Sequence, residues 1–479
     1  MRRWVIEGLL LLGSAGACVP AAGKAFFRVA ASALPSAEET AIEELVLAWP
    51  LRDSSILTQF RNQGYQVWLE CDAKDIVPAI ELAERTAVRG LIIANAAESK
   101  EFPGKISSYA ATHGKLAFRV LLSGGKQPQM KGRLVVEQDG ILQVSSPSTQ
   151  PWLDTNLAAV RLGRSVDPDS SFPLMYDFRW ATPEIPAGAM YPDAEDYALA
   201  IAESDAIRSD VIIDLPAPLQ IALAAGQAQA WSLWSKVVPY LSFSSRARTA
   251  DLQPLASLGV VVSDERSSYE PVNLLARHNL AFEAVLPAGL TAERLQNWNS
   301  VVIFCSLPAD AIAMLRDFAA NGGIVLFVNP HQEFPWRSVA PLRRESHLAT
   351  YAVGTGQIVE LGEPVIDPEN FARDLRRLIG RERSVLALWN SLTALGIPYR
   401  ERGQRGTLLY LVNYAEQPDS IQIQIKGQFT GVRLESPEQN CCVSLYFVER
   451  NGFTEFTVPS LRVAARVHLD FREAASAAQ

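Results

Sequence analysis

Acidic residues follow several short apolar runs of the sequence, at the points where the chain would leave a buried strand. Asp177 lies in the segment Met175–Trp180, and Asp214 follows the run Val211–Ile213. Two carboxyl groups about 5–9.5 Å apart can hydrolyse a glycosidic bond, one as proton donor and the other as base or nucleophile. We therefore take Asp177 and Asp214 as the candidate catalytic pair.

Other polar and aromatic residues near predicted strand ends could line the same site. Aromatic faces stack on sugar rings, and an arginine can bind hydroxyl groups or shift the pKa of a carboxyl group. The candidate substrate-binding residues are Trp49, Glu70, Asn95, Tyr176, Arg179 and Trp180.

Each of these residues also has a structural interpretation. Asp177 could be a buried carboxylate that pairs with Arg179, Asp214 could cap the helix that follows it, and Trp49 could be a core or rim aromatic. The arrangement of the site distinguishes the two cases. Two carboxyl groups facing each other across an open pocket would indicate an enzyme, whereas a mouth filled by Trp or Arg side chains would indicate a binding protein.

The segment 40–248 must position these residues. It alternates short apolar runs with amphipathic stretches, in about seven or eight β/α steps. This rhythm favours a (β/α)8-type barrel, complete or incomplete, over an open sheet, and barrel enzymes carry their sites at the carboxyl ends of the strands. Two alternating runs around Asp139-Gly140 predict an inserted hairpin.

Two further segments have different patterns. Segment 251–348 alternates strands and helices and predicts a small doubly wound α/β domain. Segment 350–472 begins with two predicted helices, Pro368–Ile379 and Ser384–Leu395, followed by six alternating strands that predict an antiparallel β-sandwich. The fold class is thus α/β and multidomain.

Composition limits the possible partners. The chain has 479 residues, a formal net charge of −8 and no basic block, which argues against a nucleic-acid partner. Its five histidines and five cysteines show no metal-ligand spacing. We expect no metal and no cofactor.

Residues 1–23 resemble an export signal. Arg2 and Arg3 precede the apolar stretch Gly8–Leu12, and Ala15–Ala17 fits a cleavage site. Cleavage after Ala17 would leave Cys18 at the new N-terminus, where a bacterial lipoprotein carries its lipid, although a plain secretory peptide is the alternative. We expect a periplasmic or extracellular protein that meets a membrane only through this anchor.

The other four cysteines, Cys71, Cys305, Cys441 and Cys442, are predicted to be buried thiols. Cys441 and Cys442 are adjacent, and neighbouring Cα atoms about 3.8 Å apart do not favour a bridge between them.

Three short passages carry a resemblance to a known family. Ser300–Phe304 and Phe318–Val325 resemble a strand, helix, Asn-Gly-Gly and strand passage, and Leu409–Tyr414 resembles a strand that opens a terminal sandwich. With the order of the segments, they resemble family 42 β-galactosidases and the glycosidases allied to them. The resemblance implies a carbohydrate ligand, a middle domain like a class I glutamine amidotransferase, and a homo-oligomer as an alternative to a monomer.

The sequence departs from that family at its catalytic residues. The family uses a glutamate preceded by Asn after strand four and a second glutamate after strand seven. Here the fourth run ends in Leu121–Gly125, and the seventh ends in Asp214. The middle segment has no G-x-C-x-G elbow around Cys305. The sequence therefore leaves two hypotheses: an exported glycoside hydrolase, or a non-catalytic glycan-binding or assembly protein with a degenerate barrel.

Overall fold

The computed structural model describes residues 23–30, 33–94, 102–121, 136–138, 141–143, 155–166, 174–178, 192–246, 252–263, 265–391, 393–401, 406–415 and 417–471. The predicted export signal up to position 22, with Cys18, lies outside these residues. Within them, no helix is both long and apolar enough to cross a membrane.

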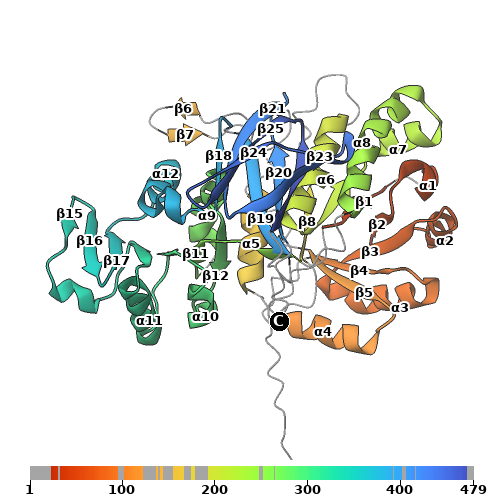
Figure 1. The fold of residues 1–479 in the computed structure, drawn as a ribbon. Coiled ribbons are helices and arrows are strands. Elements are labelled where there is room, and N and C mark those ends of the chain that lie inside the picture. Colours follow the sequence, from red (N-terminus) through yellow and green to blue (C-terminus); the bar gives the residue numbers. More distant parts are fainter. Residues whose placement is uncertain are drawn as a thin grey trace, which may run out of the picture.

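The amino-terminal region is a closed parallel barrel of seven strands (Figure 1). Closure is made by β1, which pairs in parallel with both the second and the last strand. The strands are β1 (Ala25–Arg28), β2 (Glu44–Ala48), β3 (Gln66–Asp72), β4 (Gly90–Ala94), β5 (Ala117–Leu121), β8 (Leu174–Phe178) and β9 (Asp210–Asp214). The predicted barrel is confirmed. Its first strand, β1, lies before position 40, outside the predicted bounds 40–248. The sequence pattern missed it because it is only four residues long and adjoins the predicted export signal.

Helices cover the outside of this barrel, as expected where parallel strands need crossover connections. They are α1 (Ala37–Thr40), α2 (Ser55–Asn62), α3 (Ile76–Thr86), α4 (Phe102–Thr112), α5 (Thr155–Val166), α6 (Ala194–Ile207), α7 (Ala217–Ala224) and α8 (Ala228–Arg246). The predicted hairpin is formed by β6 (Val136–Gln138) and β7 (Ile141–Gln143), which pair antiparallel. Its turn, Asp139-Gly140, lies outside the described residues.

The middle region is one seven-stranded sheet in the order β12-β11-β13-β14-β17-β16-β15. Five neighbouring strands are parallel, and β16 and β15 continue the sheet antiparallel. The strands are β11 (Leu258–Val261), β12 (Phe282–Val285), β13 (Ser300–Ile303), β14 (Ile324–Val328), β15 (Arg343–Arg344), β16 (Leu348–Val353) and β17 (Gly356–Leu361). The helices are α9 (Glu265–Arg277), α10 (Ala292–Leu295), α11 (Ala309–Ala320) and α12 (Pro368–Ile379).

The sheet corrects the boundary expected near position 348. β17 pairs with β14 in parallel, so the middle sheet extends to Leu361. The reason is that β16 and β17 form a hairpin, and its second strand, β17, joins the parallel sheet beside β14. This pairing with a strand distant in sequence leaves no trace in the local pattern of residues.

The carboxyl-terminal region is a sandwich of a six-stranded sheet, β10-β19-β20-β26-β22-β23, and a four-stranded sheet, β18-β21-β25-β24. Apolar side chains from both sheets form one core cluster between them. The strands are β10 (Leu252–Pro254), β18 (Leu386–Trp389), β19 (Ala394–Glu401), β20 (Gly406–Asn413), β21 (Asp419–Lys426), β22 (Phe429–Ser436), β23 (Gln439–Ser444), β24 (Phe447–Arg450), β25 (Phe453–Leu461) and β26 (Ala464–Phe471).

The sandwich confirms one of the two predicted helices before it and contradicts the other. Helix α12 spans Pro368–Ile379 as predicted, with Asp367 capping its first turn. The predicted helix Ser384–Leu395 is wrong, because β18 occupies part of it and pairs antiparallel with β21. Leu386 and Leu388, two positions apart on β18, both point into the sandwich core. Their burial there favours a strand over the helix that the spacing of apolar residues suggested.

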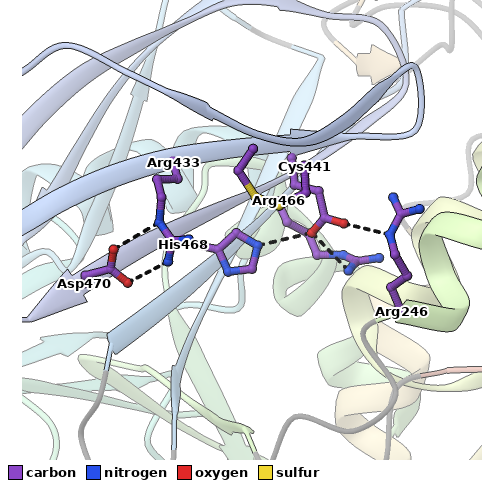
Figure 2. Close-up of a disulfide and its surroundings, with 8 residues drawn as sticks. Arg246, Arg433, Cys441, Arg466, His468 and Asp470 are labelled. Atoms are coloured by element: carbon purple, nitrogen blue, oxygen red, sulfur yellow. Dashed lines mark hydrogen bonds and ion pairs between the residues drawn. A yellow bond between two sulfur atoms is a disulfide. The ribbon is translucent and has the colours of Figure 1, made fainter.

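Ion pairs join the barrel helices to the sandwich (Figure 2). Glu435 on β22 accepts hydrogen bonds from Arg246 of α8 at 3.0 Å and from Arg466 of β26 at 3.4 Å, and its carboxylate lies 3.1 Å from His468 Nε2. Arg466 Nη2 also lies 3.3 Å from the carboxylate of Asp205 on α6. The charged groups therefore fix the sandwich against α6 and α8.

Cys441 and Cys442, on the edge strand β23, form a disulfide with each other (Figure 2). The expectation of two separate thiols is wrong here. The peptide bond between them is cis, and their Cα atoms lie 3.1 Å apart instead of the spacing of a trans peptide on which the expectation rested. Cys71 is a buried thiol, and burial, together with the nearby carboxylates of Asp75, Asp72 and Glu70, raises its pKa to about 12.

Candidate functional site

Charged side chains gather inside the barrel at the carboxyl ends of its strands. Since side chains alternate across a strand, a residue two positions after an inward-facing one also faces inward. Phe26, Trp68, Met175 and Ile212 belong to the apolar cluster that fills the barrel interior. Two positions further along each of these strands come the charged residues Arg28, Glu70, Asp177 and Asp214. These four form the mouth ring.

Arg28 lies at the centre of the mouth ring. Its Nε and Nη2 donate to the two carboxylate oxygens of Glu70 at 2.7 and 2.9 Å, which is the fork geometry of a bidentate pair. Its Nη1 donates to Asp214 Oδ1 at 2.5 Å, and its Nη2 lies 3.6 Å from Asp177 Oδ2. One guanidinium thus contacts three carboxylates from three other strands.

The mouth ring is only partly accessible to solvent. The side chains of Arg28 and Glu70 are 16% and 13% exposed, Asp177 is 5% exposed, and Asp214 is 32% exposed. Burial lowers the pKa of Arg28, but hydrogen bonding and charge from Glu70 and Asp214 outweigh it, and the net pKa is raised. Arg28 is therefore a permanent cation, and Asp214 is the carboxylate that an incoming ligand reaches most easily.

The sequence predicted three members of the mouth ring and missed the fourth. Glu70, Asp177 and Asp214 stand at strand ends as expected, and Arg28 was not among the candidates. The signal that could have found it is the short apolar run Ala25–Phe27, which ends in this arginine directly after the export-like segment. Asp214 does not cap the following helix: the N-cap of α7 is Pro216, with no side-chain cap.

The remaining candidates are placed differently. Trp49 follows β2, is half-buried and packs against the large core cluster. Tyr176 points to the outside of the barrel wall, where its hydroxyl lies 3.4 Å from Glu203 Oε2 on α6. The alternation of β8 turns Tyr176 away from the mouth, so its proposed contact with a substrate is corrected. Asn95, Arg179 and Trp180 lie outside the described residues.

Glu203 is a buried structural carboxylate. It is fully buried on α6 and accepts a hydrogen bond of 2.8 Å from the Tyr414 hydroxyl of the sandwich. Burial and the charge of Glu203 raise the pKa of Tyr176 well above its usual value, so this tyrosine remains a neutral donor. The group joins barrel and sandwich rather than contributing to the mouth.

A second charged layer lies at the opposite end of the barrel, below the apolar cluster. Lys24 Nζ donates to Glu44 Oε1 at 2.8 Å, and Arg119 Nε donates to Asp210 Oδ2 at 2.7 Å. Trp68 Nε1 donates to the other oxygen of Glu44 at 2.6 Å. We call these four charged residues the lower layer.

No group of three or more His, Cys, Asp or Glu side chains suited to a metal ion occurs among the residues that the structure describes. The carboxylates of the mouth ring can accept hydrogen bonds from hydroxyl groups, and its guanidinium can donate them.

Comparison with known proteins shows which solved structures share the fold of this chain. No family model matches the chain, and none of the curated proteins matches it. Among solved structures, α-L-fucosidase isoenzyme 2 from Paenibacillus thiaminolyticus is 11% identical, with a TM-score of 0.59 over 95% of this chain and 100% of that one. The β-galactosidase from Rahnella sp. R3 is 10% identical, with a TM-score of 0.50 over 89% of this chain and 95% of that one.

These likenesses confirm the architecture that the sequence resemblance implied. They extend over the barrel, the middle sheet and the sandwich together, since they cover most of both chains. The likeness of the middle region to a class I glutamine amidotransferase stays a prediction. The chain has the multidomain fold of glycoside hydrolases.

Proposed function

We propose that this protein binds a carbohydrate at the barrel mouth without hydrolysing it. The observation that carries the proposal is Arg28, which contacts all three carboxylates of the mouth ring. Hydrolysis needs two carboxyl groups that face each other across an open pocket. Here one guanidinium contacts both carboxyl groups of the candidate pair, with Nη2 at 3.6 Å from Asp177 and Nη1 at 2.5 Å from Asp214, and a mouth filled by an arginine indicates a binding protein.

Carboxylate oxygens suit the binding of sugar hydroxyl groups, because they accept hydrogen bonds from them. Charge-assisted hydrogen bonds are stronger than neutral ones, and Arg28 holds Glu70 and Asp214 in fixed positions before a ligand arrives. Asp214, the most exposed of the three, is the first contact.

The test is a combined measurement of binding and turnover. The mature chain is incubated with a panel of oligosaccharides, and both the heat of binding and the release of new reducing ends are followed. We expect binding without release, and we expect Asp214→Asn to weaken binding by at least about tenfold, because a charge-assisted bond contributes about 1.5–3 kcal/mol. Asp317→Asn, a surface carboxylate that is 68% exposed, is the matched control.

The second candidate function is hydrolysis of a glycosidic bond with Asp177 and Asp214 as the carboxyl pair. It is favoured by the fold, which the chain shares with a fucosidase and a β-galactosidase, and by the positions of the two residues on the adjacent strands β8 and β9. Release of reducing ends that disappears in Asp177→Asn would establish this function and overturn the binding proposal.

We also propose that the chain is exported and carries a lipid at Cys18. The support for export is the amino-terminal pattern, in which Arg2 and Arg3 precede an apolar stretch and a small-residue cleavage site. Mass spectrometry of the mature N-terminus checks this: a diacylated Cys18 supports the anchor, and an unmodified terminus near Ala17 supports plain secretion. Size-exclusion chromatography of the same material distinguishes a monomer from the homo-oligomer.

A further inference from the structure

In the part of the chain that the structure describes, the outer face of the four-stranded sheet of the sandwich bears a groove. Leu388, Ile423 and Val458 of this sheet point into the core between the two sheets. The residues that alternate with them, among them Trp389, Gln422 and Gln424, face the other way and line a groove of about 1120 Å³. Ligand pockets measure about 300–1,000 Å³, so the groove has room for several sugar units.

Two aromatic side chains border this groove and are exposed to solvent. Trp389 is 42% exposed and Tyr446 is 86% exposed. Exposed apolar groups that border one groove mark a binding surface. The guanidinium of Arg381 lies 5.2 Å from the centre of the Trp389 ring, which fixes the ring orientation by a cation–π contact.

The polar side chains of the groove form a connected network. Arg381 Nε donates to Gln424 Oε1 at 2.8 Å, and Arg381 Nη2 donates to Glu455 Oε1 at 2.7 Å. Gln424 Nε2 donates to the same Glu455 oxygen at 2.8 Å. Because each partner holds the next in place, the donors and acceptors are ordered before a ligand binds, which lowers the entropy cost of binding.

The charges of the groove nearly cancel. Its lining holds three cationic side chains, Arg381, Lys426 and Arg450, and two carboxylates, Glu382 and Glu455. The central pair, Arg381 and Glu455, is already joined. A ligand that offers hydroxyl groups as both donors and acceptors fits this surface better than one that carries repeated negative charge.

We propose that the groove is a second carbohydrate-binding site, specific for a neutral polysaccharide. Pyranose rings stack on Trp389 and Tyr446, while their hydroxyl groups bind the Gln424–Glu455 pair in the floor. The groove shares no residue with the mouth ring, so this inference does not depend on the function proposed for the mouth.

The test uses the full chain with three neutral polysaccharides, barley β-glucan, galactomannan and dextran, and with alginate as an anionic one. Binding is followed by affinity electrophoresis and calorimetry. We expect at least one to bind with an affinity that salt does not change, and we expect Trp389→Ala or Tyr446→Ala to weaken it about tenfold. Trp389→Phe should restore most of the affinity by keeping an aromatic face. Leu342→Ala, an apolar side chain 73% exposed in the middle region, is the control and should bind as the unmodified chain does.

Three results would overturn this inference. The first is no binding to any of the three polysaccharides. The second is binding to alginate alone that weakens as salt rises, which would identify an anionic ligand. The third is a change in oligomeric state with Tyr446→Ala while glycan affinity stays constant, which would make the groove a contact between two copies of the chain. Asp214→Asn should leave binding at the groove intact, so failure of the mouth proposal remains distinguishable.

Discussion

The two charged layers inside the barrel differ in their balance of charge. The lower layer joins two cations, Lys24 and Arg119, to two carboxylates, Glu44 and Asp210. The mouth ring joins one cation, Arg28, to three carboxylates. Both layers border the same apolar cluster, so they differ in stoichiometry and exposure rather than in the fold around them.

This difference separates a structural layer from a candidate functional one. In the lower layer each charge has a counterpart, which is the arrangement that makes buried ions tolerable. In the mouth ring, by contrast, the side chain of Asp214 is 32% exposed, so hydroxyl donors from a ligand can reach its carboxylate.

The largest expected effect comes from removing the cation of the mouth ring. Arg28→Met leaves three carboxylates facing one another, and we expect the free energy of unfolding to fall by about 3–5 kcal/mol. Urea denaturation at pH 7 measures this loss. An unchanged free energy of unfolding in this variant would contradict the role given to Arg28.

A smaller loss is expected in the lower layer. Burial, against the opposing charge of Arg119, raises the pKa of Asp210 above its usual value, so its ionised form is already disfavoured there. Asp210→Asn keeps the volume and a carbonyl acceptor, and we expect a loss of about 1–3 kcal/mol. The comparison of the layers requires that glycan affinity at the mouth stay the same in this variant; a tenfold drop would show that the lower layer also serves binding.

The ion cluster between barrel and sandwich should show as acid sensitivity. Burial of Glu435 alone would raise its pKa, but hydrogen bonds from His468 and Arg246 and the charge of Arg466 lower it to about 2, from an ordinary 4.5. A carboxyl group with a depressed folded-state pKa stabilises the fold above its unfolded pKa. This stabilisation should therefore be lost as pH falls from about 4.5 to about 2.

Thermal unfolding followed between pH 6 and pH 2 checks this expectation. Glu435→Gln should be less stable at pH 6 and should lose less stability on acidification than the unmodified chain. If both proteins follow parallel pH profiles, the acid sensitivity arises from other carboxylates.

The smallest effect is expected for an exposed pair. Arg433 and Asp470 form two hydrogen bonds, of 3.1 and 2.9 Å, on a face where both side chains are nearly half exposed. Exposed pairs contribute about 0–1 kcal/mol, so Arg433→Met should change the free energy of unfolding by less than about 1 kcal/mol. A loss comparable to that of Arg28→Met would remove the distinction between buried and exposed ion pairs in this chain.

The spacing of apolar residues along the sequence correctly predicted the elements whose buried face is set by that spacing alone. Helix α12 has a capping Asp367 and an amphipathic repeat, and its bounds match the prediction. The segment Ser384–Leu395 has helical spacing too, but pairing with β21 turns part of it into a strand. The boundary near position 348 failed for the same reason, since β17 finds its partner in β14 rather than in its chain neighbours alone.

The amino-acid sequence by itself determined that Glu70, Asp177 and Asp214 would stand at strand ends, because apolar runs of strand length end at or beside them. Only the tertiary structure decided what they contact. Arg28 and Asp214 are 186 positions apart, and they meet because β1 and β9 close the barrel in a register that pairs these two residues. Closure is a long-range event with no local signature, and it placed one guanidinium among three carboxylates.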